Sequence, residues 1–397
     1  MFLKELSQMR GKLFKAITAA ICAAGLMLTG CGGDKAKSGG EAVKIGAIGE
    51  LTGANASYGT SMMRGFKLAV KEINAAGGVN GKKLQLVEAD TKSEPAEAAN
   101  AMSKLISQDK VPMVAGIFTS SSAIAACNIS ETNKVPFLAI GATNPAVTVG
   151  KDGKTKPNTF RVCFIDPFQG TVGANFVLNE LKAKKAAIYV DNSSDYAKGL
   201  AAFFKQAYTA KGGSIVAEEA YLQKDTDFKA VLTKIKAAGP DVLYVPGYYE
   251  EVGKIVKQSR ELGINCAIVG GDGWDSPKLA EIAGAAALNN TFFTNHYSPD
   301  SDSAESKAFV AAFEKEYQQK PDAPAVLGYD GIKLLADAMK RAGSTDSAKV
   351  AAALADTKSF KAVTGETSLN DKHDAVKSAV IIELKDGKQA YRATVKP

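Results

Sequence analysis

The sequence predicts an α/β protein with two lobes, each built on a doubly wound parallel sheet. Apolar runs of strand length alternate with longer stretches of helical periodicity, which favours parallel strands joined by helices. The alternation occurs twice along the chain. The part after residue 42 has about 355 residues, which exceeds one ordinary core. We therefore expect two lobes of the same architecture.

The expected elements follow from these patterns in chain order. The first series has strands at 43–48, 84–87, 111–118 and 135–140, and helices at 57–76, 95–108 and 121–133. The second series has strands at 186–190, 214–219, 242–245 and 267–269, and helices at 169–183, 196–211, 227–238 and 250–262. After residue 291 we expect helices at 303–318, 323–342 and 347–355, then strands at 378–384 and 390–395.

The late helices have no lobe of their own, so they must pack on one already described. If they return to the first lobe and the last strands to the second, the chain crosses between lobes near Val162, Phe293 and Val376. Three crossings make a hinge that resists twist and allows closure. The predicted domains are 43–162 with 294–376 as lobe 1, and 163–293 with 377–397 as lobe 2.

The N-terminal segment predicts export. Residues 1–30 have a basic start and an apolar run of 13 residues at 16–28, too short for a bilayer, which needs about 20. This is typical of a signal peptide. The sequence Leu28-Thr29-Gly30-Cys31 resembles a bacterial lipobox, which predicts a lipidated Cys31 and a flexible tether at 31–42. The alternative is a chance cysteine after a plain signal peptide.

Composition excludes some functions. The formal charge of +7 includes +3 from the signal peptide, where four basic residues face Glu5, and no basic stripe remains to indicate nucleic-acid binding. Three cysteines remain in the body, so one disulfide at most can form and the pair stays open. These cysteines are Cys127, Cys163 and Cys266.

The stretch 116–145 carries the clearest site signal. One apolar run ends in Thr119 and three serines, beginning with Ser120, before a helix, and the next ends in Gly141-Ala142-Thr143. Hydroxyls and free amides thus meet at one sheet edge, where open α/β sheets bind ligands and a helix start can hold a carboxylate. The alternative is that Ser120 is a helix N-cap and 143–145 a turn.

A tyrosine recurs at the same place in both series. The strand at 44–48 leads to Tyr58, a helix and Gly77-Gly78, and the strand at 186–190 leads to Tyr196, a helix and Gly212-Gly213. Either tyrosine alone could be partly buried packing. Their equivalent positions favour two walls of a cleft between the lobes.

Six segments in order resemble one known family. The chain is similar to the leucine/isoleucine/valine-binding proteins of ABC importers, in the type I periplasmic binding protein superfamily. The segments are GELTG at 49–53 with Tyr58-Gly59, INAAGGVNG at 73–81, FRVCFID at 160–166, DF at 227–228, PDVLY at 240–244 and GGDGW at 270–274. The resemblance implies two Rossmann-like lobes that close over a free amino acid, most often a branched-chain one, and deliver it to membrane permease subunits.

The resemblance also assigns residues. It implies that the ligand carboxylate binds Ser120, the Gly141-Ala142 backbone and Thr143. It places the partner of the α-ammonium group at Asp272, where relatives carry glutamate. Trp274 and the segment 325–329 fall near the side-chain pocket, and the aromatic cleft positions are Tyr58, Tyr196 and Tyr248. Taken alone, Asp272 could be a turn residue in its glycine-rich loop.

Two rival functions remain. An enzyme is possible on such a fold, but the chain has no G-x-S-x-G motif, dinucleotide fingerprint or paired metal-ligand spacing, so we predict no catalytic residues, metal or cofactor. We expect the two histidines, His296 and His373, at the surface. The other rival is a sensor lipoprotein for an amino acid or a small amide or carboxylate. The importer hypothesis and the sensor hypothesis both place the protein outside the cytoplasm and anchored to a membrane. In a Gram-negative cell this location is the periplasm.

Overall fold

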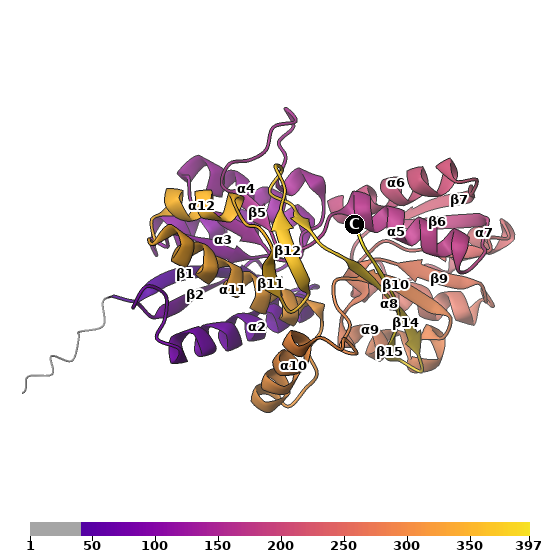
Figure 1. Cartoon of the computed structure of the whole chain (residues 1–397). Coiled ribbons are helices and arrows are strands. Elements are labelled where there is room, and N and C mark those ends of the chain that lie inside the picture. Colours follow the sequence, from indigo (N-terminus) through magenta and orange to yellow (C-terminus); the bar gives the residue numbers. More distant parts are fainter. Residues whose placement is uncertain (1–40) are drawn as a thin grey trace, which may run out of the picture. The chain divides into compact units, whose positions relative to one another are not determined.

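The computed structural model describes residues 41–397, which belong to one compact unit (Figure 1). The predicted signal peptide, Cys31 and residues 31–40 of the predicted tether lie outside the described residues. Between residues 41 and 397, no helix is both long and apolar enough to cross a membrane.

The first sheet has five parallel strands in the order β2-β1-β3-β4-β5. Alternate residues of β3 face opposite sides: Val114 packs in an apolar cluster with α3 and α4, and Ala115 in one with α2 and α11. Helices therefore cover both faces, as in doubly wound folds. The strands are β1 (Val43–Gly49), β2 (Leu84–Asp90), β3 (Val114–Gly116), β4 (Phe137–Ala139) and β5 (Thr159–Arg161), and the helices are α2 (Ala56–Ala75), α3 (Pro95–Ser107), α4 (Ser120–Asn133), α11 (Ala323–Ala342) and α12 (Ser347–Ala355).

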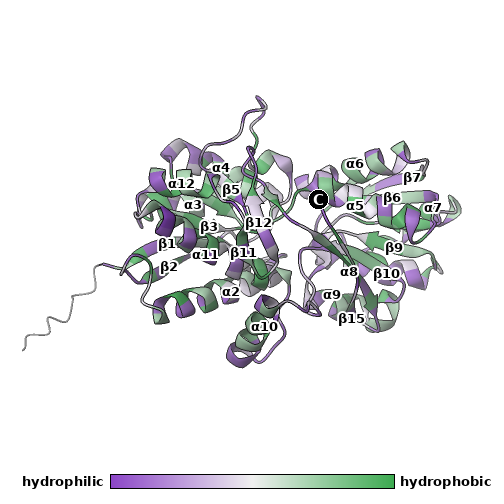
Figure 2. Ribbon diagram, in the orientation of Figure 1, coloured by the Kyte–Doolittle hydropathy of each residue, from purple (hydrophilic) through white to green (hydrophobic). Residues whose placement is uncertain are grey.

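The second sheet has the order β15-β14-β10-β9-β8-β6-β7. Its strands β6 to β10 are parallel, and β14 and β15 extend it as an antiparallel edge. The strands are β6 (Lys185–Asp191), β7 (Ser214–Tyr221), β8 (Val242–Tyr244), β9 (Ala267–Gly270), β10 (Thr291–Asn295), β14 (Ala379–Lys385) and β15 (Lys388–Val395). The helices are α5 (Asp166–Asn179), α6 (Asp195–Ala210), α7 (Lys229–Ala237), α8 (Tyr249–Glu261) and α9 (Pro277–Ala283). Hydrophobic residues are concentrated on central strands such as β9 (Figure 2).

Helices from the last third of the chain pack on the first lobe. Helix α11 packs on α2 so closely that a Cβ on Gly65 would lie 2.0 Å from the Ala325 carbonyl oxygen. Only glycine allows this approach. The remaining elements are α10 (Ala304–Tyr317) and a small antiparallel sheet of β11 (Phe360–Ala362), β12 (Gly365–Leu369) and β13 (Ala375–Val376).

The predicted fold class is confirmed: the chain forms two doubly wound α/β lobes. The lobe boundaries near Val162, Phe293 and Val376 stay a prediction. The sequence pattern does not predict β5, β10, α9 or the small sheet. The predicted strand at 111–118 is too long, because the chain turns at Gly116 (φ 149°) and Ile117 (φ 61°). A β-branched residue at positive φ is rare and marks local strain.

Both sheets have the same strand order around their first strand. Read from β2, the first sheet runs second, first, third, fourth, fifth, and β7-β6-β8-β9-β10 repeats that order in the second. The order reverses between β1 and β3 and between β6 and β8. Open α/β sheets bind ligands at the carboxyl ends of strands at such a switch point.

Candidate functional site

The loop after β3 presents the start of α4 at the first switch point. Thr119 is the N-cap of α4, but its hydroxyl donates to the buried Glu50 carboxylate (2.7 Å) and does not cap the helix. Ser120 is the first helical residue, so the alternative that it serves as the N-cap is wrong. Its Oγ accepts from the Asn144 N–H (3.2 Å), which leaves its own proton free to donate. The amides just before α4 already have an acceptor, because Glu50 accepts from the N–H groups of Phe118 (3.2 Å) and Thr119 (3.0 Å), so the donor that α4 offers to a ligand is the Ser120 hydroxyl.

The loop after β4 adds a second hydroxyl. Thr143 is fully buried, and its hydroxyl lies beside the buried carboxylate of Asp166. The Gly141 N–H points to the Ile117 carbonyl at 3.3 Å, and a Cβ on Gly141 would lie 2.1 Å from the Phe118 ring. The turn alternative holds for Asn144, whose side chain caps the short helix η1 (Pro145–Val147) through the Ala146 N–H.

Arg161 holds this second loop in place, a role that the sequence analysis missed. Its buried guanidinium donates to the carbonyls of Ala142 (2.7 Å) and Asn144 (2.9 Å) and forms an ion pair with the buried Asp374 (2.8 Å). A buried charge that is paired and hydrogen-bonded in this way fixes backbone geometry. A basic residue in the otherwise apolar segment 160–165 is the signal that could have identified it.

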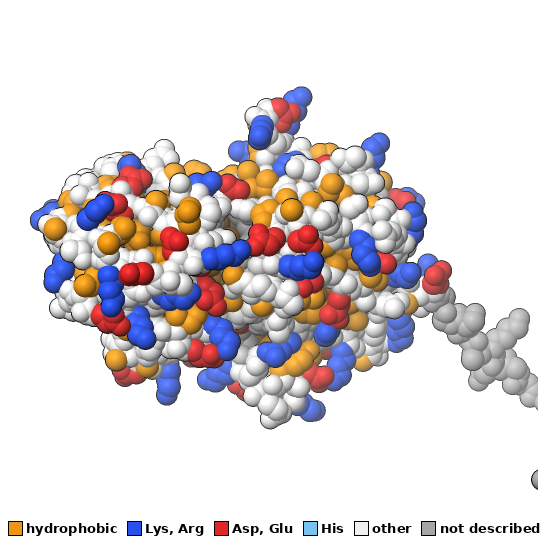
Figure 3. All heavy atoms as spheres, turned by 180° about the vertical axis from the view of Figure 1, so that it is seen from behind, with side chains coloured by type: hydrophobic (Ala, Val, Ile, Leu, Met, Phe, Trp, Pro, Cys, Tyr) orange, Lys and Arg blue, Asp and Glu red, His pale blue; other side chains and the backbone are white. Residues whose placement is uncertain are grey.

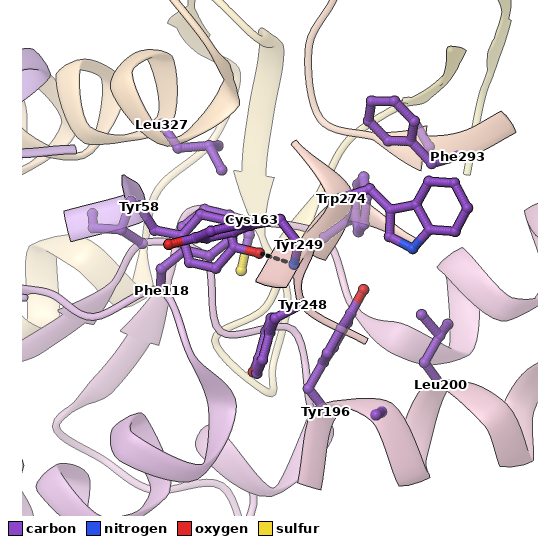
Figure 4. Close-up of a cluster of buried hydrophobic side chains, with 14 of the residues drawn as sticks. Tyr58, Phe118, Cys163, Tyr196, Leu200, Tyr248, Tyr249, Trp274, Phe293 and Leu327 are labelled. Atoms are coloured by element: carbon purple, nitrogen blue, oxygen red, sulfur yellow. Dashed lines mark hydrogen bonds between the residues drawn. The ribbon is translucent and has the colours of Figure 1, made fainter. Parts of the chain in front are cut away.

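The three predicted tyrosines meet at one place although they come from both lobes (Figure 4). Tyr58 stacks on Phe118 with ring centroids 4.5 Å apart, and its hydroxyl donates to the Gly273 carbonyl. The Tyr196 hydroxyl accepts from the Gly273 N–H (3.1 Å), and its ring stacks on Tyr248 at 5.2 Å. All of these rings are buried. The tyrosines thus form one aromatic wall across both switch points.

Asp272 lies beside this wall and is 1 % exposed. One carboxylate oxygen accepts from Gln169 Nε2 (2.7 Å), and the other pairs with His296 Nε2 (3.0 Å). Both partners are side chains from other elements, and neither carboxylate oxygen is bonded to the backbone of its own 3₁₀ turn, η2 (Asp272–Trp274). A turn role alone therefore does not account for this carboxylate.

The prediction that His296 lies at the surface is wrong. The residue is 2 % exposed, and its ring stacks on Phe164 with centroids 3.7 Å apart. Burial lowers the pKa of His296, so the imidazole is neutral at pH 7 and Nε2 carries the proton toward Asp272. His373 is partly buried, and its ring stacks on Phe160 at 4.2 Å. The loop around each histidine is polar, so sequence patterning gave no sign of burial.

Helix α5 brings two further polar side chains that the sequence analysis missed. Asp166 and Gln169 are fully buried near Asp272. Burial raises the pKa of Asp166 well above its ordinary value. A hydrogen bond with the Thr143 hydroxyl lowers this pKa in part, and the nearby negative charge of Asp272 raises it further. The expected helix began at residue 169, too late to include Asp166. The signal was Pro167, because proline favours the first turn of a helix.

Only some of the residues expected near a side-chain pocket lie beside the tyrosines. Trp274 and Leu327 lie in the same buried cluster as the tyrosines (Figure 4). The Trp274 indole donates to the Val245 carbonyl (3.0 Å), which ties the ring to the second lobe. Tyr329 points elsewhere, since its hydroxyl donates to Glu72 of α2 (2.5 Å).

The three cysteines in the described residues are free thiols, and no pair of them forms a disulfide. Cys163 is buried within the tyrosine cluster (Figure 4), and burial raises the pKa of its thiol to about 12. Within residues 41–397, no group of three or more His, Cys, Asp or Glu side chains is placed to hold a metal ion.

Comparison with known proteins gives the family. Residues 42–389 match the family model described as periplasmic binding protein. An amino acid binding protein of Pseudomonas aeruginosa is 35 % identical over 355 residues, 88 % of this chain and 91 % of that protein. The solved branched-chain amino acid transporter substrate binding protein LivJ of Streptococcus pneumoniae, in complex with isoleucine, is 42 % identical with a TM-score of 0.84 and covers 90 % of this chain and 100 % of that one.

The fold also accommodates other ligands. A solute binding protein of an ABC transporter from R. palustris, in complex with benzoate, is 26 % identical with a TM-score of 0.81 and covers 90 % of this chain and 97 % of that chain. The resemblance inferred from the six sequence segments is confirmed. The chain belongs to the family of periplasmic binding proteins and is similar to its Leu/Ile/Val-binding members.

Proposed function

We propose that this substrate-binding protein captures a free branched-chain amino acid between its lobes and delivers it to an ABC importer, while a lipid on Cys31 anchors it to a membrane. Family membership implies a location outside the cytoplasm. The relatives' printed names, an amino acid binding protein and a branched-chain amino acid transporter component, support the ligand class. The lipobox-like Leu28-Thr29-Gly30-Cys31 supports the anchor.

The observation that carries the proposal is the arrangement of charge and hydroxyls at the two switch points. A zwitterion that enters a buried site must exchange its water shell for donors at the carboxylate and an anion at the ammonium group. The Ser120 hydroxyl has a proton free to donate, and Thr143 supplies a second buried hydroxyl beside it. Asp272 is the buried anion, and the tyrosine wall suits an aliphatic side chain.

The same observation argues against benzoate. A benzoate brings a carboxylate but no cation, so Asp272 would face a second anion in a buried site, which is strongly unfavourable. The neighbouring His296 does not offset this charge, because burial keeps it neutral at pH 7.

A ligand screen tests the proposal. The purified protein is heated with leucine, isoleucine, valine, 4-methylpentanoate or benzoate, each at several concentrations. A ligand at 100 times its dissociation constant should add about 2.7 kcal/mol to the free energy of unfolding. We expect stabilisation by the three amino acids and none by the two plain carboxylates. Stabilisation by benzoate, with no effect of the amino acids, would refute the proposal.

A further inference from the structure

Two carboxylates bind the first turn of helix α11, outside the predicted amino-acid site. Asp322 is the N-cap, and its Oδ1 accepts from the Ala325 N–H (3.1 Å). Asp275 accepts from the Ala323 N–H (2.8 Å) through Oδ2. Position 324 between these two amides is a proline, which has no N–H. The N–H groups that the first three helical positions offer are therefore taken, one by each carboxylate.

The two carboxylates come from different lobes. Asp275 follows η2, and it also accepts from Asn295 at the end of β10 (2.9 Å) and from Gln389 of β15 (2.6 Å), both in the second sheet. Asp322 belongs with the first lobe, because it begins α11 and accepts from the Ser61 hydroxyl of α2. The bond from Asp275 to α11 thus joins the two lobes.

The next residue makes a second bond of this kind. Ser276 and Ser57, near the start of α2, contact each other through their hydroxyls (2.7 Å). Residues 275 and 276 directly follow the turn that carries Asp272 and Trp274. A movement of the second lobe that brings Asp272 toward a ligand therefore also brings residues 275 and 276 onto α2 and α11. We call the bonds of residues 275 and 276 to α2 and α11 the latch.

The latch brings two like charges together. Asp275 is buried, and Asp322 lies beside it at the edge of a cavity of about 590 Å³. The positive end of a helix amounts to about half a charge, so it compensates one carboxylate but not two. Burial and then the charge of Asp275 raise the pKa of Asp322 to about 7. If Asp275 leaves with the second lobe, the pKa of Asp322 should fall toward its ordinary value.

The groups around this pair do little to neutralise it. The hydrogen-bond donors to the two carboxylates are amides and a hydroxyl, which are uncharged. The charged or titratable groups that face the pair are Asp300 and His296 after β10, Lys320 before α11 and Lys388 of β15. Burial keeps His296 neutral at pH 7, and both lysines are exposed, where water screens their charge.

We propose that Asp275 and Asp322 form a proton-dependent latch, which favours closed lobes when Asp322 is protonated and opposes closure when both carboxylates are charged. This inference goes beyond the proposed function and rests on it for the ligand that drives closure. The closed form holds the proton more tightly than the open form, so closure takes up a proton at pH values between the two pKa values of Asp322. Ligand affinity is therefore highest at low pH, falls as the pH rises toward 7, and levels off above it.

The test is calorimetry of the full protein with leucine at pH 5 and pH 8. Titrations at pH 6 in two buffers of different ionisation enthalpy count the protons taken up on binding. One linked proton changes affinity by up to about tenfold per pH unit, so the dissociation constant should be about tenfold or more higher at pH 8 than at pH 5. Binding at pH 6 should take up protons.

Two variants assign the effect to the latch. Asp322→Asn and Asp322→Ser both keep a residue that caps helices but remove the charge. Each should reduce the ratio of the dissociation constants at pH 8 and pH 5 by about tenfold, and should reduce proton uptake at pH 6. Asp300→Asn is the matched control, because it removes the same charge from an exposed side chain that lines the same cavity. It should behave as wild type.

The outcomes separate the two proposals. If wild-type protein binds no branched-chain amino acid at either pH, the proposed function fails and the latch falls with it. If leucine binds equally well at pH 5 and pH 8, or if binding at pH 6 takes up no proton, only the latch is overturned. The latch is also overturned if both Asp322 variants keep the pH dependence of wild type. The wild-type proton count decides the question even if neither variant folds.

Discussion

Replacement of Asp272 by alanine tests the proposed amino-acid site most directly. The carboxylate is 1 % exposed and is the proposed partner of the ligand's ammonium group. Removal of one partner from a buried charge pair typically costs about 3 to 5 kcal/mol, because the other charge is left uncompensated. Leucine should therefore bind about two to three and a half decades more weakly.

The same replacement has a predictable cost in stability. It leaves the Nε2–H groups of Gln169 and His296 without acceptors, and each buried donor left unpaired costs about 1 to 3 kcal/mol. Asp272→Asn keeps one acceptor oxygen for Gln169 but loses the charge. We therefore expect a smaller loss of stability from Asp272→Asn, and a loss of affinity only slightly smaller than that of the alanine variant.

The assay is calorimetry with leucine, isoleucine and valine, combined with thermal unfolding of each variant without ligand. Asp302→Ala serves as the control, because that side chain is 97 % exposed. If Asp272→Ala and Asp272→Asn both lower the melting temperature but leave affinity within threefold of wild type, Asp272 only shapes its loop. That result would remove the main physical support for the amino-acid assignment.

Three further predictions concern stability, anchoring and motion. Burial raises the pKa of Asp322 to about 7, so the folded chain keeps a proton that the unfolded chain loses above about pH 4. The stabilising effect of that proton is lost as the pH rises toward 7. Asp322→Asn keeps the acceptor for Ser61 and the Ala325 N–H, so thermal unfolding at pH 5 and pH 8 should differ less than in wild type; an equal difference contradicts this. Cys31→Ser should leave the protein unanchored in detergent partitioning, and unchanged membrane association would refute the lipobox. Saturating leucine should reduce the radius of gyration in small-angle scattering, because the proposed site takes Ser120 and Thr143 from one lobe and Tyr196 and Tyr248 from the other; an unchanged radius counts against closure.

The fold was predictable because its signal is repeated and local. Each lobe supplies several apolar runs separated by helical stretches, so an error in one element does not change the architecture. The missed elements are those with little local signal. Strand β5 (Thr159–Arg161) has three residues, one of them a buried arginine, and the small sheet β11 to β13 is made of strands of two to five residues. Such strands depend on their partners in the sheet rather than on their own pattern.

The site was predictable only where a residue belongs to a strand end or a matched segment. Ser120 and the three tyrosines follow strands at the two switch points, and Thr143 follows β4, the neighbour of β3. Surface charge gives no comparable guide: on the face drawn in Figure 3, Lys and Arg are interspersed with Asp and Glu. The residues that the sequence analysis missed reach the site from elsewhere.

Asp272 shows why the missed residues matter. The sequence predicts this residue only as an acidic partner for the ligand, or as a turn residue, in a glycine-rich loop. The structure instead gives it two buried donors, Gln169 from α5 and His296 from the end of β10, which lie 103 and 24 positions away in the chain. Each donor occupies an oxygen and fixes the carboxylate in one orientation. The strength of the site therefore depends on long-range packing, which no local pattern in the sequence encodes.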